Sequence, residues 1–201
     1  MASRFVSLVG VAALVSCIGA AHADAASRAG TIVREQCAVC HGARGESSSP
    51  VFPRLAGQHA EYMQRQLGDF QSGRRESATM RPIVQSLSAD DIASLSAWFQ
   101  TQPVHAHPVE EPALAEEGRR IFHRGNPATR VAACEICHGE DGAGTETLPR
   151  LAGQHAMYVF KQLRDFNKRV RTNDNRIMHA IASRMTEAEM KAVAAYLSGL
   201  K

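Results

Sequence analysis

The sequence contains Cys37-Ala38-Val39-Cys40-His41-Gly42 and, farther along, Cys134-Glu135-Ile136-Cys137-His138-Gly139. Two cysteines three positions apart, followed directly by a histidine, form the attachment signature of c-type haem. The thiols lie one helical turn apart, so each can form a thioether with one haem vinyl group while the histidine ligates the iron. We therefore expect two haem c groups, attached covalently through Cys37, Cys40, Cys134 and Cys137, with His41 and His138 as axial iron ligands.

Other uses of a Cys-x-x-Cys pair fit this sequence less well. A zinc ribbon places its second pair about 15–20 residues after the first, whereas these pairs begin at positions 37 and 134. A thioredoxin-like redox pair needs a βαβ pattern, and no segment alternates convincingly at period two. Structural disulfides are compatible with an exported chain, but they do not require a histidine after each pair.

The first 23 residues have the features of an export signal. Arg4 supplies a positive charge, residues 5–21 are mostly apolar, and Ala21-His22-Ala23 is a cleavage site. The apolar run is too short and too rich in small residues for a good transmembrane helix. Residues 14–17 also resemble a lipoprotein processing box, so lipidation of Cys17 is an alternative. Either route leads to the bacterial cell envelope. We expect a periplasmic protein, and the alternative is a periplasmic protein associated peripherally with a membrane.

An internal repeat divides the mature chain into two halves. Pro53-Arg54-Leu55-Ala56-Gly57-Gln58-His59-Ala60 recurs without change as Pro149-Arg150-Leu151-Ala152-Gly153-Gln154-His155-Ala156. Such self-similarity indicates one structural unit used twice. We expect an all-α fold of two tandem domains, each a few helices around one haem, at 24–102 and 113–201. A proline-rich linker, 103–112, separates them and offers little to pack.

Apolar periodicity predicts three longer helices in each half. Ser88 with Asp91, and Thr186 with Glu189, each resemble a capping box at the start of the last helix. The stretch 125–133 has no counterpart in the first half. The expected helices are 26–37, 60–71, 88–100, 113–124, 156–168 and 186–199.

The second axial ligand of each iron is expected to be a methionine. Met80 and Met178 correspond when the two halves are aligned, and each is followed three positions later by isoleucine. Their recurrence downstream of each haem motif favours iron ligation over simple packing, and His/Met ligation raises the reduction potential. His179 competes with Met178 for the second iron. The remaining candidates align with apolar residues and are expected in the core: Met63, Met185 and Met190.

For four further histidines we expect no role as metal ligands. His59 and His155 also correspond, and each precedes an expected helix. We expect them to be helix-start residues hydrogen-bonded near the haem edge rather than iron ligands. His105 and His107 lie in the linker without counterparts, so no metal role is expected for them.

Taken together, these features resemble the dihaem cytochrome c4 family over the whole mature chain. The resemblance is carried by both C-x-x-C-H-G motifs, both repeated segments, Met80 and Met178. It implies two class I cytochrome folds packed about a pseudo-twofold axis with their haem edges facing each other. It also implies that Pro53 and Pro149 offer their carbonyls to the haem histidines, although each proline could instead simply form a turn.

The resemblance further implies a periplasmic electron carrier that feeds a terminal oxidase or reductase. The expected partners are a membrane-bound oxidase or reductase and an upstream quinol-oxidising complex, and the chain is expected to be a two-domain monomer. The alternatives are the cytochrome subunit of a dehydrogenase complex and a dihaem peroxidase-like enzyme. We expect no enzymatic activity, because the sequence shows no Ser/His/Asp set, no carboxylate pair near a haem motif and no phosphate loop.

Charge adds one further expectation. The formal net charge is only +3, which together with export argues against a nucleic-acid partner. Basic residues gather at 161–176. This stretch is either a solvated helix face with its loop or a docking patch for an acidic redox partner.

Overall fold

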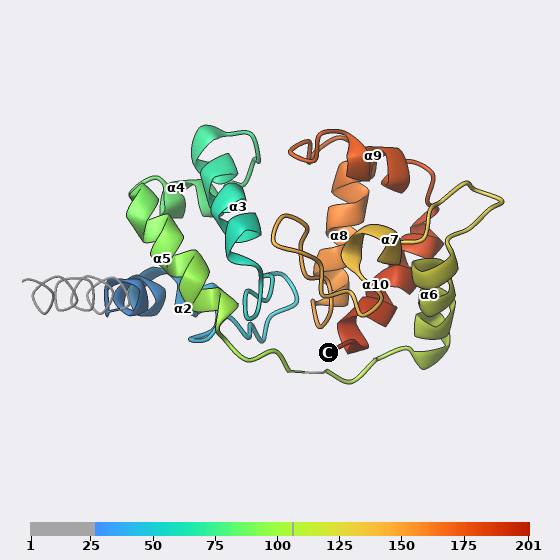
Figure 1. Ribbon diagram of the computed structural model, residues 1–201, viewed down its shortest axis with the longest axis horizontal. Helices are drawn as coiled ribbons and strands as arrows, with labels where there is room; N and C mark the ends of the chain where they lie inside the picture. Colours follow the sequence, from blue (N-terminus) through green and yellow to red (C-terminus); the bar gives the residue numbers. More distant parts are fainter. Residues whose placement is uncertain (1–26, 106) are drawn as a thin grey trace, which may run out of the picture.

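The computed structural model describes residues 27–105 and 107–201, so the expected signal segment and Cys17 lie outside the described residues. Within those ranges the regular structure is helical, apart from an isolated β-bridge between Asn126 and Val131. The helices form two groups that lie side by side, one from each half of the chain, and the linker runs along one side of both (Figure 1). The expected all-α tandem architecture is confirmed.

In the first domain, a helical run enters the haem motif directly. Residues 27–32 are α-helical and continue through η1 (Val33–Cys37) into α2 (Ala38–His41). Three further helices follow, and α3 packs against both of the others. Their apolar faces enclose a core that contains Val33, Met63, Phe70, Leu95 and Phe99. The three helices are α3 (Ala60–Ser72), α4 (Met80–Val84) and α5 (Ala89–Gln100).

The second domain repeats this plan. Its helices α6 and α8 pack on the last helix, α10. Gly118 permits the close approach of α6, because a Cβ there would lie 1.9 Å from the Ala192 carbonyl oxygen. The core contains Ile121, Phe122, Leu163, Met190 and Leu197. The helices are α6 (Pro112–Arg124), α7 (Glu135–His138), α8 (Ala156–Asn167), α9 (Ile177–Ala182) and α10 (Glu187–Gly199).

The two capping boxes are confirmed, but each is braced differently. Asp91 caps α5 and also pairs with the Arg28 guanidinium, which holds the pKa of this carboxyl well below its ordinary range. Glu189 caps α10 and accepts hydrogen bonds from Asn126 (2.6 Å) and Thr129 (3.4 Å). The additional stretch 125–133 therefore supplies a polar brace in the second domain where the first domain uses an arginine.

The linker is packed more closely than the sequence suggested. A Cβ on Gly57 would lie 2.3 Å from Cγ2 of Val104, and one on Gly153 would lie 3.4 Å from Cγ1 of the same valine. A Cβ on Gly199 would lie 2.3 Å from Cγ2 of Val109. The expectation of a linker with little to pack was wrong, because glycines from both domains open room for its valines.

Candidate functional site

The first haem motif places His41 with one ring nitrogen occupied and the other free. The motif ends where Gly42 adopts a φ of 81°, a left-handed conformation that glycine takes without strain. His41 is 5% exposed, and its Nδ1–H donates to the Pro53 carbonyl at 2.8 Å. Burial lowers the pKa of His41, which favours the neutral ring that a metal requires. Nε2 is therefore the nitrogen available to an iron.

The second motif has the same geometry. Gly139 follows α7 with a φ of 80°, and His138 is 7% exposed. Its Nδ1–H donates to the Pro149 carbonyl at 3.2 Å, and burial lowers the pKa of this histidine as well. The two hydrogen bonds confirm the carbonyl role of both prolines. This contact fixes the ring orientation, as it commonly does for metal-ligating histidines.

Three of the four motif cysteines, Cys37, Cys40 and Cys134, are half-buried, whereas Cys137 is exposed. Burial raises the pKa of Cys37 and of Cys134 to about 11, so both thiols are protonated at neutral pH. Val39 and Ile136, which stand between the cysteines, are instead 88% and 74% exposed. Among the described residues, none of the four cysteines forms a disulfide. Each motif thus turns the second of its two middle residues outward and its histidine inward.

Five of the six described methionines separate into two groups, and the sixth, Met157, is 57% exposed on α8. Met63, Met185 and Met190 are at most 5% exposed and lie within the two cores, as expected. Met80 and Met178 are half-buried and pack against the edge of the core in their own domains. The neighbouring His179 directs Nδ1 to the Phe166 carbonyl at 2.9 Å, at the end of α8.

His59 and His155 lie at helix starts, as expected, but their partners lie in the opposite domain. The Nε2 atom of His59 is 2.8 Å from the Ala143 carbonyl oxygen, and Nε2 of His155 is 2.9 Å from the Ser47 carbonyl oxygen. The sequence reasoning missed this interdomain role. Its only signal was the recurrence of the histidine within a repeated segment.

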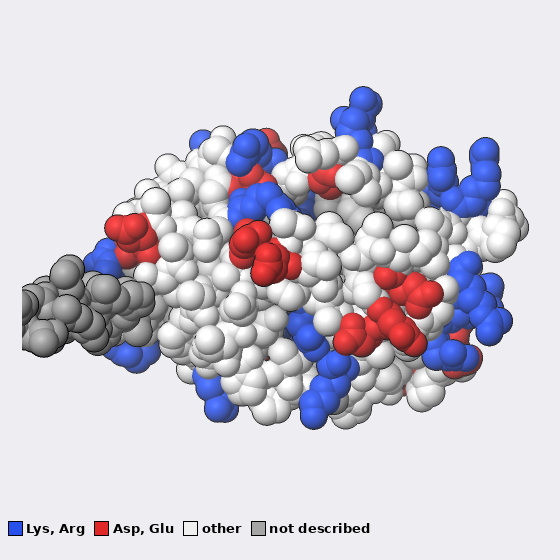
Figure 2. Space-filling model, viewed as in Figure 1, with Lys and Arg blue, Asp and Glu red and all other residues white. Residues whose placement is uncertain are grey.

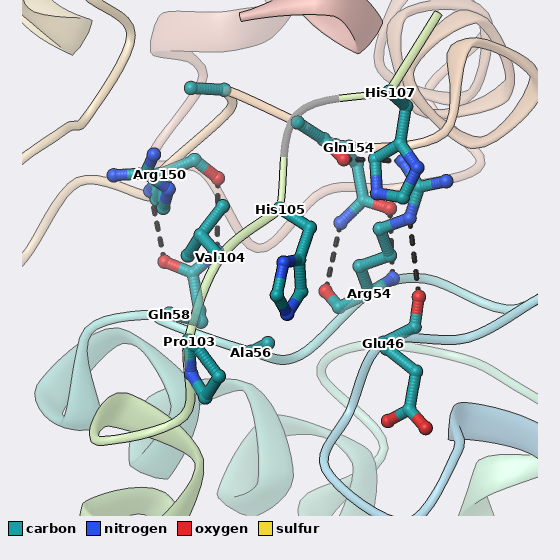
Figure 3. A pocket seen from close by; sticks show the side chains of 12 residues that line it. Glu46, Arg54, Ala56, Gln58, Pro103, Val104, His105, His107, Arg150 and Gln154 are labelled. Carbon is teal, nitrogen blue, oxygen red and sulfur yellow. Dashed lines mark hydrogen bonds between the residues drawn. The ribbon is translucent and has the colours of Figure 1, made fainter. Parts of the chain in front are cut away.

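The repeated segments meet each other at the domain junction (Figure 3). The Gln58 side chain accepts from the Arg150 amide at 2.9 Å and donates to the Arg150 carbonyl at 3.0 Å. Gln154 makes the equivalent pair with Arg54, both at 2.9 Å. Each half therefore gives the other the contacts that it receives, as a pseudo-twofold axis requires.

A second exchange between the domains lies on α3 and α8 and the loops that follow them. The Tyr62 hydroxyl accepts from Arg171 at 3.0 Å, and the Tyr158 hydroxyl accepts from Arg75 at 2.8 Å. Gln66 and Gln162 each accept from both arginines, at distances between 2.7 and 2.9 Å. Neither arginine was predicted to have this role, although the two correspond in the repeat.

This exchange removes one cation, Arg171, from the basic stretch 161–176, whose other five cations are exposed. Arg171 is turned into the domain junction, and Lys161 pairs with Asp165 within α8. Other cations lie dispersed over the face of the molecule seen in Figure 2, mixed with carboxylates. The stretch is therefore divided between the interior junction and the surface.

The linker closes a small cavity at the same junction. His105 and His107 line it, together with Arg54, Arg150 and Glu46. Burial lowers the pKa of His107, and the nearby Arg54 acts in the same direction.

In the part of the chain that the structure describes, no helix is both long and apolar enough to cross a bilayer.

Comparisons with known proteins agree with this geometry. The sequence model of the Cytochrome c family matches residues 26–103 and 115–201. Cytochrome c4 of Pseudomonas aeruginosa is 37% identical over 96% of this chain and 98% of its own. The thiosulfate dehydrogenase electron acceptor of Stutzerimonas stutzeri is 37% identical over 82% of this chain and 78% of its own.

The solved structures lead to the same family. The crystal structure of reduced recombinant cytochrome c4 from Pseudomonas stutzeri superposes with a TM-score of 0.83 at 34% identity. The superposition covers 88% of this chain and 98% of the Pseudomonas stutzeri chain. Each of the two similar domains combines an inward-facing histidine, which can ligate iron, with a pair of cysteines, which can attach a haem c covalently. The chain therefore belongs to the dihaem cytochrome c4 family of electron-transfer proteins.

Proposed function

We propose that the chain is a periplasmic electron carrier with two His/Met-ligated haems. It receives electrons from a quinol-oxidising complex and delivers them to a membrane-bound terminal oxidase or reductase. Cys37, Cys40, Cys134 and Cys137 hold the haems, and the axial pairs are His41 with Met80 and His138 with Met178. The observation that carries the proposal is the equivalence of the two sites, each with an inward histidine fixed by a prolyl carbonyl.

The axial methionines are supported by position and by elimination. Met80 and Met178 lie at the core edge of their domains, whereas Met63, Met185 and Met190 are enclosed in the cores and Met157 is 57% exposed. His179 contacts the Phe166 carbonyl through Nδ1, which leaves its Nε2 as open as that of the haem histidines, so the choice of Met178 over His179 rests on the correspondence of Met178 with Met80 in the repeat. A haem c with both axial positions filled by protein supplies one-electron exchange. With no ligand position left for a substrate, we propose that the protein is a carrier and not an enzyme.

The proposed division of the chain follows from the same evidence. Residues 1–23 are the signal, 24–102 and 113–201 the two domains, and 103–112 the linker. The gap between the two segments matched by the Cytochrome c model, 104–114, supports a boundary at the linker. Cleavage after Ala23 releases the protein into the periplasm, whereas processing at Cys17 would anchor it to a membrane by a lipid.

A second candidate is the electron-acceptor subunit of a dehydrogenase. It is favoured by the relatives named thiosulfate dehydrogenase electron acceptor. In this case the donor is a dehydrogenase instead of a quinol-oxidising complex. The haem sites and the one-electron chemistry are the same, so only the donor differs.

Binding of small ligands tests the carrier against the peroxidase-like alternative. The reduced protein should bind carbon monoxide poorly at neutral pH and consume no peroxide, because protein ligands occupy the iron. It should be oxidised rapidly by membranes that contain a terminal oxidase, and more slowly as salt rises. Stoichiometric carbon monoxide binding with catalytic peroxide consumption would instead show a dihaem enzyme. Reduction by a quinol-oxidising membrane fraction or by a thiosulfate dehydrogenase then separates the two donors.

A further inference from the structure

A chain of polar contacts runs along the second haem motif. The His123 Nδ1 lies 2.5 Å from a carboxylate oxygen of Glu135, and its Nε2 lies 2.8 Å from the Tyr196 hydroxyl. Glu135 stands directly after Cys134, inside the haem-attachment motif. The three residues come from α7, α6 and α10, so the contact joins the attachment turn to the two main helices of its domain.

Backbone and ring contacts hold these three side chains in place. The Cys134 amide donates to the Phe122 carbonyl at 2.8 Å, which ties the attachment turn to the end of α6. The Phe122 ring lies 5.5 Å from the Tyr196 ring, and the His123 ring lies 5.7 Å from it, measured between centroids. The Glu135 and His123 side chains are only 31% and 25% exposed. Glu135 is therefore a partly desolvated carboxylate held in one position.

The direction of the hydrogen bonds follows from the tyrosine. Burial raises the pKa of Tyr196, so its hydroxyl keeps its proton and can donate to Nε2 of His123. The proton on Nδ1 is then directed at Glu135. Other charges also act on Tyr196, from Arg119 and Glu116 on α6 and from Glu140 after α7. Arg119 and Glu116 pair with each other. Glu135 is the carboxylate that contacts the His123 ring.

Among residues 27–105 and 107–201, the first haem motif has no such arrangement. Alanine occupies the position of Glu135, since Ala38 follows Cys37, and Trp98 occupies the position of Tyr196. Trp98 packs against the ring of Phe99 at 5.0 Å between centroids. In a molecule whose haem histidines and domain junction repeat so closely, this difference distinguishes one haem environment from the other.

We propose that Glu135, positioned by His123 and Tyr196, lowers the reduction potential of the second haem. A negative charge beside an iron stabilises the ferric form, since reduction adds negative charge there. The effect is larger for a partly buried, fixed carboxylate than for an exposed one, which water and salt screen. His123 and Tyr196 are positioning residues: they keep the carboxylate against the motif.

The test is a redox titration of the intact dihaem protein with Glu135→Gln, followed by haem signals resolved in NMR spectra. At a fixed applied potential near the midpoint, the ratio of reduced to oxidised second haem should rise three- to tenfold. A tenfold change corresponds to about 59 mV for one electron. The first haem serves as an internal reference and should shift much less. Glu140→Gln is the matched control, because it removes an exposed carboxylate close to the same motif and should have a smaller effect.

A double-mutant cycle tests the positioning role. Tyr196→Phe keeps the ring and removes the hydroxyl, so it should shift the second haem in the same direction as Glu135→Gln, by a smaller factor. Added to Glu135→Gln, it should cause little further change. Equal shifts for Glu135→Gln and Glu140→Gln, equal shifts of both haems, or additive effects would overturn the inference.

The inference rests on haem attachment at the second motif. A protein without haem on Cys134 and Cys137 would contradict the proposed function itself, whereas intact haem spectra with an unmoved potential would contradict only this inference.

Discussion

Single residues decide which atoms face each iron. His41 and His138 each commit Nδ1 to a prolyl carbonyl, so Nε2 remains for the metal. The same contact stabilises one tautomer and one ring angle, because a donor to a carbonyl must carry its hydrogen on that nitrogen. For the opposite side of each haem we propose a methionine, for which the chain offers several candidates.

The first prediction concerns these methionines. Oxidised protein should show methionine-to-ferric charge-transfer absorption from both haems, and Met80→Ala or Met178→Ala should each remove about half of it, because one of two His/Met sites is lost. Met185→Ala is the control. It should leave the absorption intact but lower the free energy of unfolding by about 2–5 kcal/mol, since it empties a core position. Loss of the absorption in Met185→Ala would show that the alignment of the two halves misidentified the ligand.

Helices and the linker carry the next level of organisation. The last helix of each domain begins with a capping box, and each box uses a carboxylate that another part of the domain also holds. For α5 this is Asp91 with Arg28, near the start of the first helical run. One side chain thus connects the two ends of the domain.

The pH dependence of stability should report this contact. Arg28 lowers the pKa of Asp91 in the folded chain, so the carboxylate stabilises the fold above its unfolded pKa and loses that contribution as the pH falls below about 4. Asp91→Asn should cost about 1–2 kcal/mol near neutrality, and the difference from the parent protein should shrink in acid. Urea unfolding between pH 3 and 7 measures this. Asp90→Asn, at an exposed neighbouring position, should show a much smaller and nearly constant difference.

A pair of glycines tests how the linker is held. Gly57→Ala forces an alanine to a φ of 66° and brings its Cβ toward Val104, so we expect a loss of about 1–3 kcal/mol in unfolding free energy. Gly68→Ala on α3 meets no neighbour and should stabilise by about 0.5–1 kcal/mol. Adding Val104→Ala to Gly57→Ala should recover part of the loss. No recovery would mean that the linker valine does not press on this glycine.

These elements also show what the sequence could and could not reveal. Local patterns predicted the longer helices and both capping boxes, because their contacts lie within a few residues. The prolyl contacts were one of two roles considered for Pro53 and Pro149, the other being a simple turn, and the structure confirms the contacts. The linker docking and the Arg75 and Arg171 contacts were missed, since each depends on partners more than 40 residues away that only the folded chain brings together.

At the scale of the whole molecule, the domain junction is self-complementary. Gln58 and Gln154 exchange equivalent contacts, and so do Tyr62 and Tyr158. Asn173 breaks the symmetry: it donates to Gln66 at 2.9 Å and to Asp69 at 2.6 Å across the junction, and serine occupies the equivalent position in the first half. Most of what each half offers to the other is therefore a copy of what it receives.

The excised halves test this symmetry. Residues 24–102 alone should fold around their haem with a His/Met spectrum, since they hold a complete set of helices and candidate ligands. They should also associate into dimers as concentration rises, because a second copy can present the same backbone groups to Gln58 and the same arginine to Tyr62. Analytical ultracentrifugation measures this. Gln58→Ala should weaken the dimer without changing the haem spectrum, and a half that stays monomeric at all concentrations would show that the asymmetric contacts dominate.

The exchanged contacts at the junction also carry a historical consequence. A junction in which each partner gives what it receives is the geometry of a homodimer, and duplication followed by gene fusion would place both subunits in one polypeptide. A tether raises the effective concentration of its two ends to roughly millimolar, so the subunits no longer depend on affinity to stay together. In a homodimer, every mutation appears in both subunits. After fusion, a substitution such as the glutamate beside Cys134 can change the environment of the second haem and leave that of the first haem unchanged.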